Sequence, residues 1–234
     1  MKIGIIGAGH IGGTLARRLT ALGHDVAIAN SRGPETLAAI AKATNAKPVT
    51  VRDAVRGKDV VIVSIPEKSV RDLPRDLFAA NDRAVVVDTG NYYPQRDGRI
   101  AEIEDGTAES RWVAQQLGRP VVKAFNTIYA QHLAERGRAA DQAGRISIPV
   151  AGDDAAAKRV VLKLVDELGF DGVDAGSLDE SWRQQPGTPI YGTDLTHDAA
   201  ERALANAPRE RKPEFRAASA SSATPSSNRP TAAP

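Results

Sequence analysis

The stretch "MKIGIIGAGHIGG", residues 1–13, decides the fold of this 234-residue chain. The apolar run Ile3–Ile6 is typical of a buried strand, and Gly7, Gly9 and Gly12 follow it with G-x-G-x-x-G spacing. In this pattern the first glycine permits a tight turn, the second lets the backbone approach a pyrophosphate, and the third lets strand and helix pack closely. Because the match follows a strand and opens a helix expected over residues 10–22, it predicts a dinucleotide-binding site.

Short apolar runs alternate with helical patterns along the rest of the chain. Continuous β-branched runs indicate strands that are buried on both faces, as in parallel sheets covered by helices. The alternation predicts an α/β protein of the Rossmann type, with a doubly wound, mostly parallel sheet. After the first strand, further strands are expected within residues 25–29, 47–51, 59–66, 83–91 and 120–126.

The segment "VAIANSRGPET", residues 26–36, indicates which dinucleotide is bound. An acid at the end of the second strand accepts the ribose hydroxyls of NAD and repels a 2′-phosphate. This chain carries Asn30, Ser31 and Arg32 there, and a hydroxyl and a guanidinium can hold a phosphate. Asp25 precedes the strand and is interpreted as a solvated turn residue. The cofactor predicted is therefore NADP(H), with NADPH as the hydride donor.

Polar and small residues follow three later strands, at the edge where open α/β sheets bind ligands. His10 and Ile11 are expected to offer backbone amides to phosphate, and Tyr92 and its neighbour Tyr93 could stack on a flat substrate ring. The cofactor-binding residues predicted are Gly7, Ala8, Gly9, His10, Ile11, Gly12, Asn30, Ser31, Arg32, Ser64, Ile65, Pro66, Thr89, Gly90, Asn91, Ala124 and Asn126.

Composition excludes several classes of protein. The chain has no cysteine and only four histidines, none of them spaced i, i+4, so neither a disulfide framework nor a metal site is expected. A formal net charge of +2 gives no reason to expect nucleic acid as a partner. No apolar run approaches the roughly 18 residues of a membrane span. A soluble cytoplasmic protein is the expectation.

The predicted domain organisation has three parts. Residues 1–150 form the NADP-binding Rossmann domain, and residues 151–206 a small C-terminal α/β extension packed on it. The strand before residue 150 is expected at a sheet edge because it contains Pro149. Residues 207–234, rich in Ser, Ala, Thr and Pro, are predicted to be a disordered tail. The loop "QQPGTP", residues 184–189, is expected to be irregular and surface-exposed.

The N-terminal stretch, "NSR", "IVSIP", "VVKAFNTI" and the block from "IPVAGDD" to "DAGSL" together resemble the NADP oxidoreductases that use the deazaflavin coenzyme F420. The reductase domain of STEAP ferric reductases is a more distant likeness. The resemblance spans about residues 1–200. It implies direct hydride transfer between NADPH and F420 or a flavin-like acceptor, in which the protein mainly aligns two rings. The resemblance implies neither a catalytic side chain nor a metal. It does imply a homodimer.

The same resemblance implies that Thr127, Ile128 and Tyr129 lie on the substrate side, together with Tyr92. Residues 126–130 read Asn-Thr-Ile-Tyr-Ala, where the deazaflavin reductases tend to carry His-Thr-Ile-Pro-Ala, so the acceptor stays open. Two alternatives remain. One is a β-hydroxyacid-type dehydrogenase with Lys123 as its catalytic lysine, although no long helical domain follows residue 150. The other is a non-catalytic NADPH-binding sensor or regulatory protein.

Overall fold

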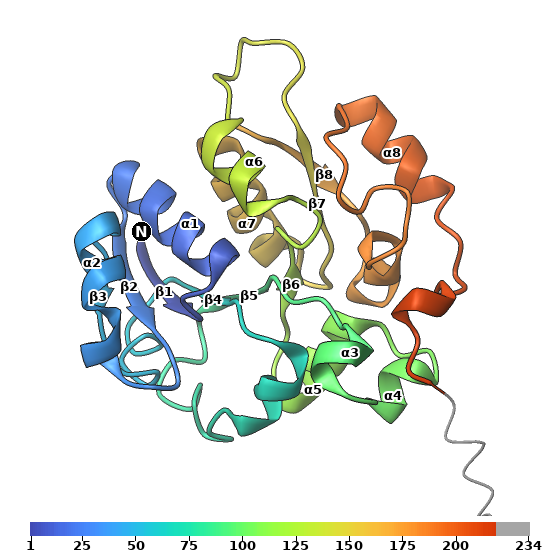
Figure 1. The fold of residues 1–234 in the computed structure, drawn as a ribbon. Helices are drawn as coiled ribbons and strands as arrows, with labels where there is room; N and C mark the ends of the chain where they lie inside the picture. The colour runs from blue at the N-terminus through green and yellow to red at the C-terminus, as the bar shows by residue number, and fades with distance from the viewer. Residues whose placement is uncertain (219–234) are drawn as a thin grey trace, which may run out of the picture.

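A six-stranded parallel sheet forms the centre of the molecule, with strand order β3-β2-β1-β4-β5-β6 (Figure 1). The structure is a computed structural model and describes residues 1–218. The order reverses between β1 and β4, which is the switch point of a doubly wound sheet. The Rossmann-type prediction is therefore confirmed. The strands are β1 (Lys2–Ile6), β2 (Asp25–Ala29), β3 (Lys47–Pro48), β4 (Val60–Val63), β5 (Val85–Asp88), β6 (Val122–Lys123), β7 (Ser147–Val150) and β8 (Asp171–Asp174).

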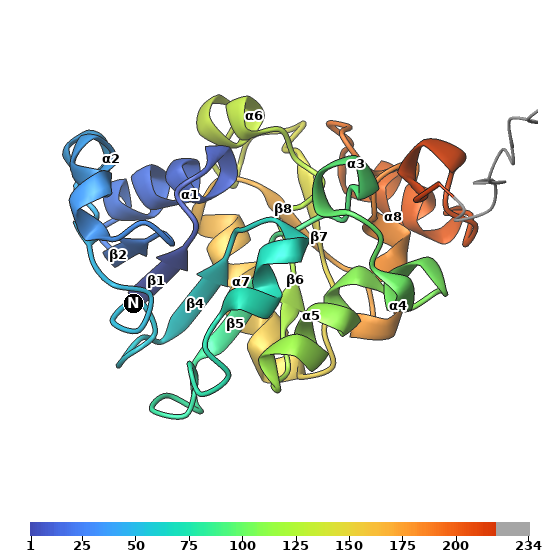
Figure 2. The ribbon, with the colours of Figure 1, turned by 60° about the horizontal axis from the view of Figure 1, so that its bottom comes forward.

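Helices cover both faces of the sheet (Figure 2). Leu15 of α1, Leu133 of α6 and Leu164 of α7 pack on one face, whereas Trp112 of α5 packs on the other. The helices are α1 (His10–Ala21), α2 (Ala38–Thr44), α3 (Pro94–Asp97), α4 (Ala101–Glu104), α5 (Glu109–Leu117), α6 (Ala130–Glu135), α7 (Ala155–Glu167) and α8 (His197–Ala205). Short 3₁₀ helices span Pro34–Leu37, Glu67–Asp72, Leu178–Gln184 and Pro213–Phe215.

Strands β7 and β8 form a separate parallel pair next to β6. Strand β7 is an edge strand of this two-stranded sheet, as the sequence predicts, and one antiparallel bridge between Lys123 and Ala151 links the chain just after it to β6. Ser147 and Ala151 direct their backbone N–H groups away from β8, to Leu195 and Lys123. Backbone N–H groups alternate in direction along a strand, so the N–H position of Pro149 also points away from β8. The proline therefore removes no hydrogen bond between β7 and β8.

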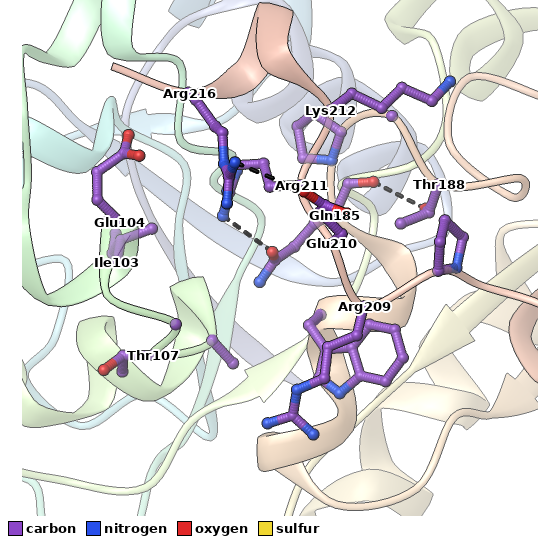
Figure 3. A pocket seen from close by; sticks show the side chains of 16 residues that line it. Ile103, Glu104, Thr107, Gln185, Thr188, Arg209, Glu210, Arg211, Lys212 and Arg216 are labelled. Carbon is purple, nitrogen blue, oxygen red and sulfur yellow. Dashed lines mark hydrogen bonds and ion pairs between the residues drawn. The ribbon is translucent and has the colours of Figure 1, made fainter. Parts of the chain in front are cut away.

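Residues 207–218 are ordered, which corrects the prediction of a disordered tail from residue 207 (Figure 3). Arg211 reaches into the protein and donates to Glu109 at 2.8 Å and to Gln185 at 2.9 Å. Phe215 packs near Tyr93, with ring centroids 6.2 Å apart. A few long-range contacts of this kind hold a segment whose composition alone indicates disorder. Residues 219–234 of the predicted tail lie outside the described residues.

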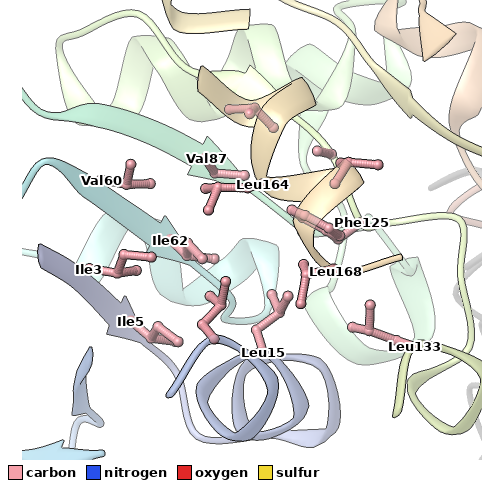
Figure 4. Packing of buried hydrophobic residues seen from close by; sticks show 14 of the residues in the cluster. Ile3, Ile5, Leu15, Val60, Ile62, Val87, Phe125, Leu133, Leu164 and Leu168 are labelled. Carbon is pink, nitrogen blue, oxygen red and sulfur yellow. The ribbon is translucent and has the colours of Figure 1, made fainter. Parts of the chain in front are cut away.

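The largest apolar core joins residues on both sides of position 150 (Figure 4). Ile62 of β4 and Leu15 of α1 share it with Leu164 of α7, so the predicted Rossmann domain and its extension pack against each other. Asp154 begins α7 by accepting hydrogen bonds from two backbone N–H groups of its first turn. Among residues 1–218, no helix combines the length and apolar character that crossing a membrane requires.

Candidate functional site

The glycine loop between β1 and α1 has the geometry that its spacing predicts. Gly7 has φ +115°, and a Cβ there would lie 2.0 Å from the Ser64 carbonyl oxygen, so only glycine fits between β1 and β4. A Cβ on Gly12 would lie 2.1 Å from the Gly7 oxygen, which is the close helix–strand contact. A Cβ on Gly9 would meet no protein atom within 4 Å. The middle glycine therefore faces open space, where a ligand can approach the backbone.

The turn after β2 presents two free polar side chains. The Asn30 side-chain oxygen accepts from the Arg32 backbone N–H at 2.9 Å, and this turn leaves Ser31 and Arg32 exposed. Neither of these two side chains has a hydrogen-bond or ion-pair partner within residues 1–218. Asp25 lies at the opposite end of β2, exposed and paired with Lys47 at 2.7 Å. Asp25 is therefore exposed and away from the site, as predicted, but it is the first residue of β2 rather than a turn residue before it.

One cleft of about 620 Å³ joins the glycine loop to the ends of β2 and β4. Its lining includes nine of the predicted cofactor-binding residues, namely Gly7, Ala8, Gly9, Asn30, Ser31, Arg32, Ser64, Ile65 and Pro66. The lining residues that sequence reasoning missed are Ile6, Val51, Ser69, Asp72, Leu73 and Pro74. Most of these lie in or beside the 3₁₀ helix after Pro66. The position of that proline at the end of a strand could have indicated that the residues after it also line the cleft. His10 lies beyond this cleft, in a neighbouring hollow with Arg17.

The predicted residues at the ends of β5 and β6 do not line this cleft, and most of them are buried. Asn126 is 5% exposed, and its amide nitrogen donates to Asn91 at 3.0 Å and to the Gln184 carbonyl oxygen at 2.7 Å. Gln184 in turn donates to the Asn126 side-chain oxygen at 2.9 Å. Asn126 therefore joins the β6 end to the 178–184 helix. Both of its amide protons are therefore bound within the protein.

The network around Asn126 overturns the expectation of an exposed loop at residues 184–189, because Gln184, Gln185 and Pro186 are buried. The other rim positions are equally enclosed. Thr127 and Ile128 are 3% and 6% exposed. Ala124 is fully buried. These side chains pack inside the protein. A ligand could contact these residues only through their backbone atoms or after a conformational change.

The prediction that Tyr92 lies on the substrate side is wrong. Tyr92 is fully buried, and its hydroxyl accepts from Ile100 N–H and lies within hydrogen-bond distance of two acceptors for its single proton, Glu104 at 2.8 Å and the Gly98 carbonyl at 3.0 Å. Burial, the largest effect, raises the pKa of Tyr92 to about 12, so the hydroxyl stays neutral. Of the two adjacent tyrosines, the sequence did not show which one faces the core.

Tyr93 takes the half-exposed position instead. Its hydroxyl forms a hydrogen bond with the Tyr191 hydroxyl, and Arg96 lies over its ring at 5.1 Å. Tyr129 is 57% exposed, and its ring meets His132 edge-on at 5.4 Å between centroids. A Cβ on Gly192 would lie 2.9 Å from the Tyr129 hydroxyl, so this side chain rests on the loop that carries Tyr191. Tyr93, Tyr129 and Tyr191 are therefore aromatic side chains after β5 and β6 that are not fully buried.

A buried charge cluster lies behind the ends of β4, β5 and β6. The Lys123 ammonium is fully buried and donates to Asp88 at 3.1 Å and to the Gly90 carbonyl oxygen at 2.5 Å. Burial lowers the pKa of Lys123, but the carboxyl groups of Asp88, Glu109 and Glu67 outweigh it and hold the pKa above its usual value. Lys123 is thus a structural cation that a substrate does not reach.

Glu67 and Glu109 complete this cluster, and both are fully buried. Burial, followed by the negative charge of Asp88, raises the pKa of Glu67 well above its ordinary value. Burial also raises the pKa of Glu109, against the opposing effect of Arg211. These acids were not predicted as site residues, because their contacts link positions far apart in the chain.

Comparison with known proteins assigns the family. The family model described as NADP oxidoreductase, coenzyme F420-dependent, matches residues 2–92, which include the glycine loop, the Ser31–Arg32 turn and Pro66. The crystal structure of the hypothetical protein SMa0349 from Sinorhizobium meliloti is 33% identical, with a TM-score of 0.72. The match covers 85% of this chain and 97% of that one. The chain belongs to the F420-dependent NADP oxidoreductase family.

Two further relatives agree with the family. A crystal structure from Arthrobacter sp. FB24, named a putative F420-dependent NADP-reductase, is 28% identical with a TM-score of 0.63. That match covers 76% of this chain and 86% of the other. Metalloreductase STEAP3 of Rattus norvegicus is 28% identical over 181 residues, which is 76% of this chain and 34% of STEAP3. The chain spans about a third of the length of the curated relatives it matches. Both resemblances predicted from the sequence are thus confirmed.

Proposed function

We propose that this member of the family transfers a hydride between NADPH and a deazaflavin (F420) or flavin-like acceptor. The observation that carries the proposal is the position of Ser31 and Arg32, which line the same cleft as Gly7 and Gly9 and have no other partner among the described residues. A hydroxyl and a guanidinium at this place suit a 2′-phosphate, while the open space at Gly9 suits a pyrophosphate.

The rest of the cleft fits the remaining parts of the nucleotide. Val51, Leu73 and Pro74 give an apolar surface for the adenine, and Ile65 and Pro66 border the nicotinamide side. The Arg32 guanidinium is also placed to stack on a flat base. When bound, NADPH supplies the hydride, and the protein holds its ring against the acceptor.

We assign the acceptor side to the aromatic groups that follow β5 and β6 and to Tyr191, which contacts them. Tyr129 is exposed and rests on the loop of Tyr191, which bonds to Tyr93. Aromatic rings of this kind stack on planar heterocycles, which supports a deazaflavin or flavin. The predicted substrate-side residue Tyr129 keeps this role in the proposal, and Tyr93 replaces the buried Tyr92.

The buried position of Lys123 disfavours the dehydrogenase alternative. A catalytic lysine must reach the substrate, whereas the Lys123 ammonium is enclosed and bonded to Asp88 and Gly90. The described residues after position 150 contain helices of 13 and 9 residues, and no long helical domain.

The test is oxidation of NADPH with a panel of acceptors: a deazaflavin, a flavin and a ferric chelate. Turnover of the deazaflavin or the flavin is expected, and Tyr129→Ala should raise the KM for that acceptor while leaving the Kd for NADPH unchanged. Leu22→Ala, an exposed apolar residue at the end of α1, is the matched control. Tight NADPH binding without turnover of any acceptor would contradict the proposal and favour a non-catalytic NADPH sensor.

A further inference from the structure

The buried cluster behind the cleft has one more negative group than it has cations. Three carboxyl groups gather there, those of Glu67, Asp88 and Glu109, each at most 2% exposed. Two cations oppose them: Lys123, which is fully buried, and Arg211, whose side chain is 11% exposed. Three acids and two bases leave one uncompensated charge among the described residues. An unpaired buried charge is so costly that such a group takes up a proton instead.

Two of the three acids accept hydrogen bonds from strong donors, although one oxygen of Glu109 has no partner among the described residues. Asp88 accepts from the Gly90 N–H at 2.8 Å and from the Ser110 hydroxyl at 2.6 Å, in addition to the lysine ammonium. Glu109 accepts from Arg211 at 2.8 Å. Hydrogen bonds and opposite charges of this kind stabilise a carboxylate. Within the part of the chain that the structure describes, Glu67 has no such donor on either oxygen, so it is the acid best placed to hold the extra proton.

Glu67 is the acid that remains, and neither of its carboxyl oxygens has a hydrogen-bond partner among the described residues. The charged groups facing it are Asp88 from β5, Lys123 from β6, Glu109 from α5 and Asp97 from α3. Asp97 is compensated separately by Arg96, at 2.8 Å. Burial and the neighbouring acids raise the pKa of Glu67, in agreement with a proton held on this group.

The place of Glu67 connects it to the cleft. It follows Pro66, which lines the cleft directly. A Cβ on Gly90 would lie 2.6 Å from Glu67 Oε1, so the carboxyl group rests against the backbone at the end of β5. The carboxyl group of Glu67 thus lies directly after Pro66, which borders the proposed nicotinamide side, and against Gly90, whose carbonyl oxygen accepts from Lys123.

We propose that Glu67 stores one proton and releases it when the nicotinamide ring becomes positively charged, so that the cluster supplies the proton that accompanies hydride transfer. This inference rests on the proposed function. A ring that changes from neutral NADPH to cationic NADP⁺ beside a buried acid favours the ionised form of that acid.

The step is balanced in atoms and electrons. The hydride leaves NADPH with two electrons and bonds to the deazaflavin or flavin-like acceptor, which gains one negative charge. The O–H bond of the Glu67 carboxyl breaks, its electron pair stays on the oxygen, and the proton neutralises the reduced acceptor. After NADP⁺ has left, Glu67 is protonated again by one proton from the bulk solvent, which is the proton that the overall reaction consumes. The sum is NADPH, acceptor and one proton giving NADP⁺ and the doubly reduced, protonated acceptor.

The experiment measures protons rather than turnover. The full chain is titrated calorimetrically with NADP⁺ and with NADPH, each in two buffers of different ionisation enthalpy. Both nucleotides carry the same 2′-phosphate, so proton exchange at that group cancels in the comparison. NADP⁺ binding is expected to release up to one proton more than NADPH binding does. Glu67→Gln should abolish this difference while both nucleotides still bind, because the amide keeps the shape but carries no labile proton.

Glu102→Gln is the matched control, since Glu102 is exposed and paired with Arg71; it should retain the full difference. Equal proton release with both nucleotides in the unchanged chain, or a difference that survives Glu67→Gln, overturns the proton store. Failure of the unchanged chain to bind either nucleotide overturns the proposed function itself. Should Glu67→Gln not fold, infrared difference spectra of the unchanged chain decide the matter. Adding NADP⁺ must remove a band of a protonated carboxyl, and an unaltered band refutes the proposal.

Discussion

Lys123→Met should destabilise the protein strongly. Methionine keeps an unbranched chain of similar length but removes the ammonium between Asp88 and the Gly90 carbonyl oxygen. Lys123 is fully buried and Asp88 is 2% exposed, so solvent cannot replace the lost partner. Breaking a buried pair of this kind costs about 3–5 kcal/mol, because one charge stays behind uncompensated. For a chain of this size that corresponds to a fall in Tm of about 6–20 °C.

Urea unfolding followed by circular dichroism measures this change. Lys47→Met is the matched control, because its ammonium pairs with Asp25 on the surface at 2.7 Å, where such pairs contribute about 0–1 kcal/mol. Lys123→Met/Asp88→Asn should be more stable than Lys123→Met, since the second change removes the stranded charge. A loss below about 1 kcal/mol for Lys123→Met, equal to that of the surface control, would refute the structural role assigned to the buried cluster.

Three further predictions test other parts of the structure. Gly9→Ala should leave the free energy of unfolding unchanged or slightly higher, because the added Cβ meets no protein atom, but it should abolish NADPH binding. Gly12→Ala places a Cβ 2.1 Å from the Gly7 oxygen, so it should lower the free energy of unfolding, measured in urea, by about 1–3 kcal/mol. Arg211→Ala should lower stability by about 1.5–3 kcal/mol, since Glu109 loses its charged donor, and adding Glu109→Gln should restore part of the loss. For Glu67 the raised pKa fixes the sign: as pH rises above the ordinary glutamate range, the unfolded chain loses this proton while the folded chain keeps it. The free energy of unfolding of the unchanged chain, relative to that of Glu67→Gln, should therefore fall by up to about 1.4 kcal/mol per pH unit until the pKa of Glu67 in the folded chain is reached. If urea unfolding shows a difference between the two proteins that does not vary with pH, Glu67 holds no proton.

Local signals were enough to predict all six strands of the sheet, although not the exact bounds of each. The β1–α1–β2 unit follows from the apolar run at Ile3–Ile6, the spaced glycines and the helical pattern up to Ala21, all of which depend on near neighbours. The turn at Ser31 and Arg32 was predicted for the same reason. Strands β3 and β6 contain only two residues each, and their register comes from neighbouring strands rather than from their own sequence.

The features that sequence reasoning missed depend on long-range contacts. Arg211 finds Glu109 about a hundred residues earlier in the chain, and this pair helps to order a segment whose composition resembles a disordered tail. Asn126 looked like a ligand group because it ends β6, yet Gln184 takes up its amide. Tyr92 and Tyr93 are adjacent, so the side facing the core was set by the 3D arrangement of α3 and α4.

The most direct test of the central claim is the relative affinity of the protein for NADPH and NADH. Each nucleotide is titrated against the unchanged chain and against Ser31→Asp/Arg32→Ala, and the two Kd values are compared. The unchanged chain should prefer NADPH, because charge-assisted hydrogen bonds to the 2′-phosphate contribute about 1.5–3 kcal/mol, which is roughly tenfold or more in affinity. The double variant should lose that preference and retain NADH binding. An equal preference for NADPH in both proteins would contradict the assignment of Ser31 and Arg32 as the phosphate site.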